Sequence, residues 1–393
     1  MKAVVLAAGE GTRMRPLSET RPKPILPVGD RPLVAHAVDA AIDAGIDEIV
    51  LVVGYEADEI RSHFGSDRRG ASIEYAVQHE QNGTAGAVAA ARDALDGPFV
   101  VINGDNRYDP AAIERLVSSG PAVAAIEVED PRNYGVLETS DGRVTGIVEK
   151  PDDPPSNLAN AGAYAFPADA VDWLDVSESE RGEREITDVL AKTIDAYDVT
   201  PVVVDRWMDV GRPWELLEAN ERALETLETD IEGAVSDEAT LRGPVVVEEG
   251  ATIEPGVVIE GPVLVRRGAT VGPNAYVRGA TVIGEGASVG HAVEVKNSVL
   301  MAGATVGHLS YVGDSVLGRD VNFGAGTTVA NLRHDGDAVE HTVKGERVST
   351  DRRKFGVALG DGVKTGINTS LYPGVSLSAG ATTDPGEVVD RDR

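Results

Sequence analysis

The first 228 residues alternate short apolar runs with segments of helical hydrophobic spacing. Buried strands are predicted from the apolar runs at 4–8, 48–53, 72–77 and 99–103. Helices are predicted from the spacing at 32–44, 56–64, 84–95, 184–197 and 213–227. This alternation is typical of a mainly parallel sheet with helices on both faces. The sequence therefore predicts an α/β domain over residues 1–228, with ligands bound at the carboxyl ends of its strands.

Beyond residue 244 the pattern changes to a repeat of six. Every sixth position from Val247 to Met301 is aliphatic or methionine, and after two single-residue slips and an irregular stretch the period returns at Leu359. Three hexads make one triangular coil, so residues 244–393 are predicted to form a parallel β-helix.

Two segments near this repeat lack its period. The acidic stretch at 229–243 is predicted to be a linker between the two domains. Residues 331–354 are rich in charge and interrupt the hexads, so they are predicted to form a loop ejected from the coil. Such a loop is either decoration or part of a site.

The charge balance narrows the classes of function. The chain carries 36 Lys and Arg against 65 Asp and Glu, a formal net charge of −29, which argues against a protein that coats a nucleic-acid backbone with cations. Because 42% of the residues are hydrophobic, the acidity is expected on the surface of a folded protein. Only 8 of the cations are lysines, and such a surface predicts a halophilic protein whose self-repulsion is screened by molar salt.

Cysteine content and hydropathy exclude further classes. The absence of cysteine excludes disulfides, zinc-thiolate sites and thiol nucleophiles. No apolar run reaches the roughly 18 residues that a membrane span needs. The run at 3–8 leads into a glycine-rich turn where a signal peptide would be cleaved, so it is predicted to be a buried first strand. We therefore expect a cytoplasmic protein with neither a membrane nor a nucleic-acid partner.

A glycine-rich turn and several cations follow the first predicted strand. Residues 6–17 read LAAGEGTRMRPL, and residues 21–28 read RPKPILPV. A Gly-x-Gly turn after a strand lets backbone N–H groups approach a phosphate, and Arg13 and Lys23 can neutralise a triphosphate. The glycine pair alone is as typical of a simple turn, and neither the Walker pattern nor the three-glycine dinucleotide fingerprint is present.

The whole string resembles the signature of sugar-1-phosphate nucleotidylyltransferases. The resemblance implies a Rossmann-like nucleotide-diphospho-sugar transferase domain, in which a sugar 1-phosphate attacks the α-phosphorus of a nucleoside triphosphate and expels pyrophosphate. It also implies that Arg13 and Lys23 are catalytic, stabilising the developing charge, and that Asp105 and Asp209 hold a Mg²⁺ ion. Taken alone, either aspartate is as well explained as a solvated or capping residue.

The same resemblance assigns the nucleotide and sugar contacts. They come from the N-terminal strand and turn, from a segment that reads the pyrimidine base, and from sugar-contacting positions. These residues are Leu6, Ala7, Ala8, Gly9, Gly11, Thr12, Gln78, Gly83, Thr84, Gly104, Gly135, Glu149 and Asn160. A further family stretch at 182–188 is equally well explained as the start of a helix.

The predicted β-helix carries its own polar set. Arg278 and Lys296 are 18 residues apart, which is one coil, so they are expected to stack and could grip one phosphate. His308 is expected at a coil corner, where an isolated histidine is commonly a surface residue. Here Asn331 and Lys354 follow it in order, which raises the case for a site.

This ordered set resembles the acetyltransferase half of bifunctional N-acetylglucosamine-1-phosphate uridylyltransferase/glucosamine-1-phosphate acetyltransferases, archaeal relatives included. The resemblance implies a left-handed β-helix of hexapeptide repeats, a homotrimer with sites between subunits, and acetyl-CoA as co-substrate. His308 would be the catalytic base that takes the proton of the sugar amine. The amino-sugar phosphate would be bound by Arg278, Lys296, Tyr311, Asn322 and Lys354, and acetyl-CoA by Ala325 and Asn331.

The chain departs from the bacterial pattern near these acetyl-CoA contacts. Its ejected loop is longer, Leu332 stands where the bacterial enzymes carry an aromatic residue, and Ile367 stands where they carry serine.

Two functions are consistent with these residues. The first is a bifunctional enzyme that N-acetylates glucosamine 1-phosphate and then couples the product to UTP, giving UDP-N-acetylglucosamine. The alternative is a glucose-1-phosphate thymidylyl- or uridylyltransferase whose β-helix is structural or regulatory. A structural β-helix does not need the stacked cations and His308, which favours the first function. The residues do not decide between UTP and dTTP, nor among glucosamine, galactosamine and glucose 1-phosphates.

Overall fold

The structure is a computed structural model that describes residues 1–54, 57–179 and 182–393. Its chain forms two compact units, of which the first comprises Met1–Glu10 and Pro32–Asp209, and the second Gly11–Arg31 and Val210–Arg393. The units are therefore not continuous in sequence. The segment Gly11–Arg31, called the signature loop below, groups with the C-terminal part of the chain.

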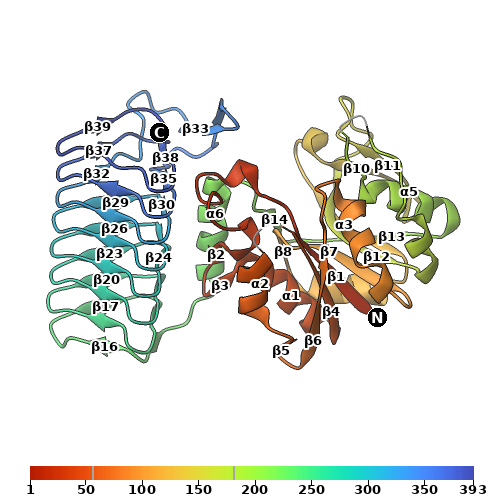
Figure 1. Ribbon diagram of the computed structural model, residues 1–393, viewed down its shortest axis with the longest axis horizontal. Helices are drawn as coiled ribbons and strands as arrows, with labels where there is room; N and C mark the ends of the chain where they lie inside the picture. The colour runs from red at the N-terminus through yellow and green to blue at the C-terminus, as the bar shows by residue number, and fades with distance from the viewer. Residues whose placement is uncertain (55–56, 180–181) are drawn as a thin grey trace. The chain divides into compact units, whose positions relative to one another are not determined.

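A ten-stranded mixed sheet forms the centre of the first unit (Figure 1). Its main path runs β11-β10-β12-β7-β1-β4-β6-β5, and β9 pairs with β12 and β13. The strands are β1 (Lys2–Ala7), β4 (Glu48–Val53), β5 (Asp67–Arg68), β6 (Ala71–Val77), β7 (Phe99–Asn103), β9 (Ala122–Glu127), β10 (Gly135–Ser140), β11 (Arg143–Glu149), β12 (Leu158–Phe166) and β13 (Thr200–Val203). The four predicted strands are the parallel centre β7-β1-β4-β6, whereas β12 runs antiparallel to β7, β9 and β10.

The predicted helices of this unit are confirmed, with shorter bounds in places, and the structure adds α4 (Pro110–Ser118), which the sequence analysis did not predict. The helices are α1 (Leu33–Asp43), α2 (Ala57–Phe64), α3 (Thr84–Ala90), α4 (Pro110–Ser118) and α5 (Ile186–Ala196), with 3-10 turns η3 (Arg92–Ala94), η4 (Pro131–Asn133) and η5 (Ala168–Trp173). Position 56, predicted as the start of α2, lies outside the described residues. Val88 of α3 and Leu190 of α5 are buried with Phe99 and Phe166 of the sheet, so apolar packing fixes these helices on one face.

The second unit contains a parallel β-helix of three sheets with eight, seven and eight strands. The first sheet holds β15 (Asp230–Ile231), β18 (Val245–Val247), β21 (Val263–Val265), β24 (Thr281–Ile283), β27 (Val299–Leu300), β30 (Val316–Leu317), β35 (Ala358–Leu359) and β38 (Ser376–Leu377). The second holds β16 (Ala234–Val235), β19 (Thr252–Ile253), β22 (Thr270–Val271), β25 (Ser288–Val289), β28 (Thr305–Val306), β31 (Asn322–Phe323) and β36 (Lys364–Thr365). The third holds β17 (Thr240–Arg242), β20 (Val258–Glu260), β23 (Tyr276–Arg278), β26 (Glu294–Lys296), β29 (Tyr311–Gly313), β32 (Thr328–Val329), β37 (Ser370–Leu371) and β39 (Val388–Val389).

The strand register explains the six-residue period. Thr252 pairs with Thr270, so one coil takes 18 residues, and the repeated aliphatic positions stack inside as one continuous core. Ile283 pairs with Leu300, which makes that coil one residue shorter. The core position is therefore Leu300 rather than the predicted Met301, because the first slip occurs before it.

The segment predicted as a linker is already part of the coil. β15, β16 and β17 lie within 230–242 and pair in parallel with β18, β19 and β20, the three strands of the next coil. The ejected loop is confirmed, and within it β33 (Glu340–Val343) and β34 (Glu346–Ser349) form an antiparallel hairpin.

The helix α6 (Pro213–Leu224) connects the other parts of this unit. It contacts β24 and β30 of the β-helix and also β2 (Pro27–Val28) of the signature loop. The buried Asn220 of α6 accepts a hydrogen bond from Gly29 N (2.8 Å) and donates to Pro27 O (3.1 Å). The signature loop further contains η1 (Thr12–Met14) and η2 (Lys23–Ile25), and β3 (Arg31–Pro32) pairs with β2 at its end.

Candidate active sites

The carboxyl ends of β1 and β7 meet in the first unit. Leu6 pairs with Asn103, and a Cβ at the following Gly104 would lie 2.5 Å from the Leu6 carbonyl oxygen. Glycine is therefore required there by close backbone approach. The predicted nucleotide contacts at 6–9 and Gly104 thus lie together at the strand ends, where α/β sheets bind ligands.

Two carboxylates lie together beside this edge. β8 (Asn106–Tyr108) pairs antiparallel with β14 (Trp207–Asp209), and Asp209 lies opposite Asn106, which is next to Asp105. Both aspartates are half-buried. Burial raises the pKa of the nearby Tyr108 well above its ordinary value, and the negative charges of Asp105 and Asp209 raise it further. Asn103 Oδ1 is buried there without a hydrogen-bond partner.

This donor set fits a magnesium ion. Mg²⁺ commonly takes one or two protein carboxylates and completes its shell with water and substrate phosphates. Within the described residues no group of three or more His, Cys, Asp or Glu side chains could hold a metal by itself, so a complete all-protein cage is not formed there.

The segment assigned to base reading is held by its own hydrogen bonds. Gln78 is buried and donates through Nε2 to Gly83 O (3.1 Å) and Asn82 Oδ1 (3.1 Å). Thr84 Oγ1 accepts from Ile186 N at 2.9 Å, which ties this segment to the start of α5. Sequence reasoning missed Gln81, whose Nε2 donates to Ala8 O at 2.7 Å and so links the segment to the end of β1.

The three predicted sugar contacts also converge. Gly135 of β10 pairs with Glu149 of β11, and a Cβ at Gly135 would lie 3.0 Å from Glu149 Oε2 and 3.6 Å from Asn160 Cβ. Asn160 Nδ2 donates to Tyr164 Oη at 2.7 Å, and burial raises the pKa of Tyr164, so this hydroxyl stays protonated.

The signature loop is compact in the second unit. Gly11 has φ +65°, and a Cβ there would lie 2.5 Å from Lys23 Cβ, so Gly11 and Lys23 pack directly together. Lys23 is 5% exposed. A side chain at Gly211 would lie 3.1 Å from Arg13 Nη2, which places the Arg13 guanidinium against the Gly211 backbone.

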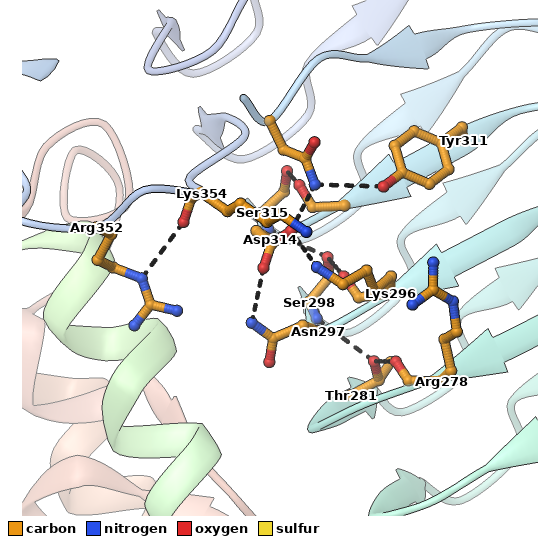
Figure 2. A network of polar contacts seen from close by, with 12 residues as sticks. Arg278, Thr281, Lys296, Asn297, Ser298, Tyr311, Asp314, Ser315, Arg352 and Lys354 are labelled. Atoms are coloured by element: carbon orange, nitrogen blue, oxygen red, sulfur yellow. Dashed lines mark hydrogen bonds and ion pairs between the residues drawn. The ribbon is translucent and has the colours of Figure 1, made fainter. Parts of the chain in front are cut away.

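The predicted cation stack of the β-helix exists, but both cations are paired with carboxylates. Arg278 and Lys296 lie opposite each other on β23 and β26. Arg278 Nη2 contacts Glu294 Oε1 at 2.7 Å. Lys296 Nζ contacts Asp314 Oδ2 at 2.7 Å (Figure 2). Sequence reasoning missed both carboxylates. The signal that could have found them is their spacing, since Glu294 is two residues before Lys296 and Asp314 is 18 residues after it.

Asp314 is the centre of the polar network in Figure 2. It is 3% exposed and accepts hydrogen bonds from Asn297 Nδ2 (2.9 Å) and from Asn331 Nδ2. Asn331 also donates to Tyr311 Oη (3.2 Å), and burial together with the Asp314 charge raises the pKa of Tyr311. The structure thus brings Lys296, Tyr311 and Asn331 together around one buried carboxylate.

His308 lies in a column of corners between the second and third sheets. Leu309 N donates to His291 O (3.0 Å), Gly326 N to His308 O (3.0 Å), and Asn368 N to Ala325 O (2.8 Å), so His308 and Ala325 stack in this column. His308 is exposed and begins the turn that leads to Tyr311. Asn322 lies exposed on the second sheet, and Lys354 lies exposed at the base of the ejected loop, bridged to Leu332.

Comparison with known proteins shows the broad class of enzyme to which the N-terminal part of the chain is similar. The nucleotidyl transferase family model matches residues 2–226, more than half of the chain, and the model of the GMPPB C-terminal domain matches residues 259–358. A putative glucose-1-phosphate thymidylyltransferase from Bacillus anthracis aligns with a TM-score of 0.53 at 30% identity, covering 58% of this chain and 98% of that one. A UDP-glucose pyrophosphorylase aligns with a TM-score of 0.51 at 26% identity, covering 56% of this chain and 96% of that one.

Relatives that match along the whole chain narrow this class. The bifunctional protein GlmU of Methanocaldococcus jannaschii is 41% identical over 100% of this chain and 95% of its own length. A bifunctional sugar-1-phosphate nucleotidylyltransferase/acetyltransferase of Sulfurisphaera tokodaii is 40% identical over 100% of this chain and 98% of its own length. The chain belongs to the archaeal family of bifunctional sugar-1-phosphate nucleotidylyltransferases/acetyltransferases.

Proposed function

We propose that this chain carries out two successive steps of UDP-N-acetylglucosamine synthesis. The first is acetyl transfer from acetyl-CoA to the amine of glucosamine 1-phosphate. The second is uridylyl transfer from UTP to the N-acetylated product with release of pyrophosphate. The observation that carries the proposal is that His308 and the Arg278–Lys296 stack lie on the β-helix of a chain whose whole length matches the bifunctional relatives.

In uridylyl transfer the chain positions charge and provides no nucleophile. Asp105 and Asp209 are proposed to hold Mg²⁺, which when bound screens the phosphate charge. Arg13 and Lys23 stabilise the negative charge that moves onto pyrophosphate as the sugar-phosphate oxygen attacks the α-phosphorus. Gly135, Glu149 and Asn160, which lie close together, are proposed to contact the sugar, and the segment at 78–84 is proposed to hold the base.

In acetyl transfer the sugar must be a neutral amine, because an ammonium group has no free electron pair. His308 takes the proton while the nitrogen attacks the thioester carbonyl; the new C–N bond forms, the C–S bond breaks, and the CoA thiolate leaves. The sugar phosphate would be bound by Arg278, Lys296, Tyr311, Asn322 and Lys354. Ala325 and Asn331 are proposed to contact acetyl-CoA.

The acetyltransferase site is proposed to form between subunits of a trimer. Arg278 and Lys296 lie on the third sheet of the prism, whereas Asn322 lies on the second. Side chains on the second and third sheets of one chain point in different directions and cannot line one small cavity together. A cavity between two chains can be lined by side chains from both sheets, because a corner of one chain then lies against a face of the other. Leu309 and Ile367 lie beside the corner column that contains His308, and they are 66% and 53% exposed. Such exposure is expected of apolar side chains that a partner subunit covers.

A second candidate, nucleotidyl transfer with a non-catalytic β-helix, is favoured by two observations. The C-terminal part matches the GMPPB C-terminal domain, and both stacked cations already have carboxylate partners. A substrate panel in molar KCl separates the two functions. CoA release with glucosamine 1-phosphate supports the bifunctional enzyme; pyrophosphate release from UTP or dTTP, with no CoA release from any amino sugar, leaves the second candidate.

A further inference from the structure

The carboxylate of Asp361 in the β-helix accepts two hydrogen bonds from the signature loop. This residue follows β35 at a coil corner. Its Oδ2 accepts hydrogen bonds from Thr20 Oγ1 (2.7 Å) and from Arg21 Nη2 (3.3 Å). Beside it, Ala379 N donates to Glu19 Oε2 at 2.7 Å. Three consecutive residues of the loop therefore contact the coil.

The Arg21–Asp361 part of this contact is buried, so solvent and salt weaken it little, whereas the Thr20–Asp361 hydrogen bond is exposed. The side chains of Arg21 and Asp361 are 5% and 14% exposed. Arg21 Nε is buried without a hydrogen-bond partner, so the guanidinium depends on this carboxylate for its charge compensation. A buried charge that loses its partner carries a large desolvation cost.

Contacts within the signature loop connect Arg21 to the proposed catalytic residues Arg13 and Lys23. Lys23 is two residues from Arg21, is nearly buried, and packs against Gly11. Met14 N donates to Gly11 O at 2.8 Å, and Ser18 Oγ donates to the same oxygen at 2.8 Å, so the turn carrying Arg13 is hydrogen-bonded to the same residue. A shift at Thr20 and Arg21 therefore moves Arg13 and Lys23 as well.

We propose that Asp361 is a positioning residue for nucleotidyl transfer, although it belongs to the β-helix. It fixes the signature loop so that Arg13 and Lys23 meet the triphosphate in one geometry. This inference rests on the proposed roles of those two cations. It gives the β-helix a part in the N-terminal reaction that is separate from acetyl transfer.

The two oxygens of Asp361 have different partners, which provides a selective variant. Oδ1 accepts from Arg319 N (2.7 Å) inside the β-helix, whereas Oδ2 faces the loop and also accepts from Arg319 Nε (3.0 Å). In Asp361→Asn the amide oxygen can keep the Arg319 N–H bond, while its NH₂ group faces donors on Thr20 and Arg21. Asp320→Asn is the matched control, since Asp320 is an exposed corner aspartate in an adjacent coil and has φ +55°, which asparagine tolerates.

The test is steady-state kinetics of both reactions on the full chain in molar KCl. For Asp361→Asn we expect kcat/KM for UTP to fall roughly ten- to a hundredfold, since misplacing a charged group by about 1 Å has such effects. Acetyl transfer should match that of Asp320→Asn, whereas the melting temperature should fall, because the buried Arg21 guanidinium loses its carboxylate partner. Thr20→Val alone should give a smaller loss, and adding it to Asp361→Asn should cost less than it does alone, because the two residues share one contact.

The outcomes separate this inference from the function on which it rests. Uridylyl transfer by the wild-type chain tests the function by itself. If Asp361→Asn retains wild-type kcat and KM for UTP, the positioning role is wrong. If it loses acetyl transfer to the same extent as uridylyl transfer, Asp361 is only a structural residue of the coil, which also overturns the proposal.

Discussion

Replacing the buried carboxylate of Asp314 tests the polar network around the proposed amino-sugar site. Asp314→Asn keeps the size of the side chain, and asparagine tolerates the left-handed backbone there, with φ +52°. The change removes one charge and leaves Lys296, whose side chain is 17% exposed, without its counter-ion at 2.7 Å. Asn331 loses the same acceptor oxygen.

Two magnitudes follow from this geometry. Breaking a buried ion pair from one side costs about 3–5 kcal/mol, and because asparagine keeps one acceptor we expect the lower end, about 3 kcal/mol. For a unit of this size that lowers the melting temperature by roughly 6–12 °C. Since Lys296, Tyr311 and Asn331 lose their common anchor, KM for glucosamine 1-phosphate should rise about tenfold, equivalent to about 1.4 kcal/mol.

Calorimetry and CoA-release kinetics, each with Asp320→Asn as control, measure both effects. Nucleotidyl transfer should be unchanged. An unchanged melting temperature together with a lower KM would refute the reasoning, because Asp314 would then compete with the sugar phosphate for Lys296 instead of orienting it.

Three further predictions concern pH, salt and the signature loop. His341 is fully buried and donates through Nδ1 to Gly374 O (3.0 Å), and burial lowers its pKa. Stability should therefore be complete above about pH 6.5 and fall below it, because the unfolded chain binds the proton first; His341→Gln should flatten this dependence in thermal melts. The net charge of −29 predicts a melting temperature that rises between low and molar KCl, and a constant one would contradict the halophile hypothesis. Gly11→Ala should lower nucleotidyl transfer more than tenfold in kinetic assays, because its Cβ would lie 2.5 Å from Lys23 Cβ, while acetyl transfer at wild-type rate would show that the fold survives.

The periodic parts of the fold could be predicted from the sequence. Interior positions of a β-helix recur every six residues, and parallel central strands are continuous apolar runs, so Val247 to Val295 and β1, β4, β6 and β7 are readable. The exact slip at Leu300 was not, since Met301 is equally apolar and also buried. Strands β9 to β13 escaped prediction. The pairing of β9 with β12 and β13 joins segments distant in sequence, which no local pattern reports. The antiparallel hairpin of β10 and β11 is local, and sequence reasoning missed it.

Parts of the candidate sites that follow the repeat could likewise be predicted, and parts that depend on burial or distant contacts could not. The one-coil spacing of Arg278 and Lys296 predicted their stack, which the register confirms. Asp314 was not recognised as their neighbour, because its importance comes from burial and not from a motif. The contact between Arg21 and Asp361 joins positions 340 residues apart, and no local pattern reports such a pairing.

The central claim is that one chain performs two reactions at separable sites. Its most direct test assays Asp105→Ala and His308→Ala side by side for CoA release from acetyl-CoA with glucosamine 1-phosphate and for pyrophosphate release from UTP with N-acetylglucosamine 1-phosphate. The account predicts that Asp105→Ala loses pyrophosphate release and keeps CoA release, and that His308→Ala shows the reverse. CoA release at the wild-type rate by His308→Ala, or loss of both reactions in either variant with the fold intact, would contradict it.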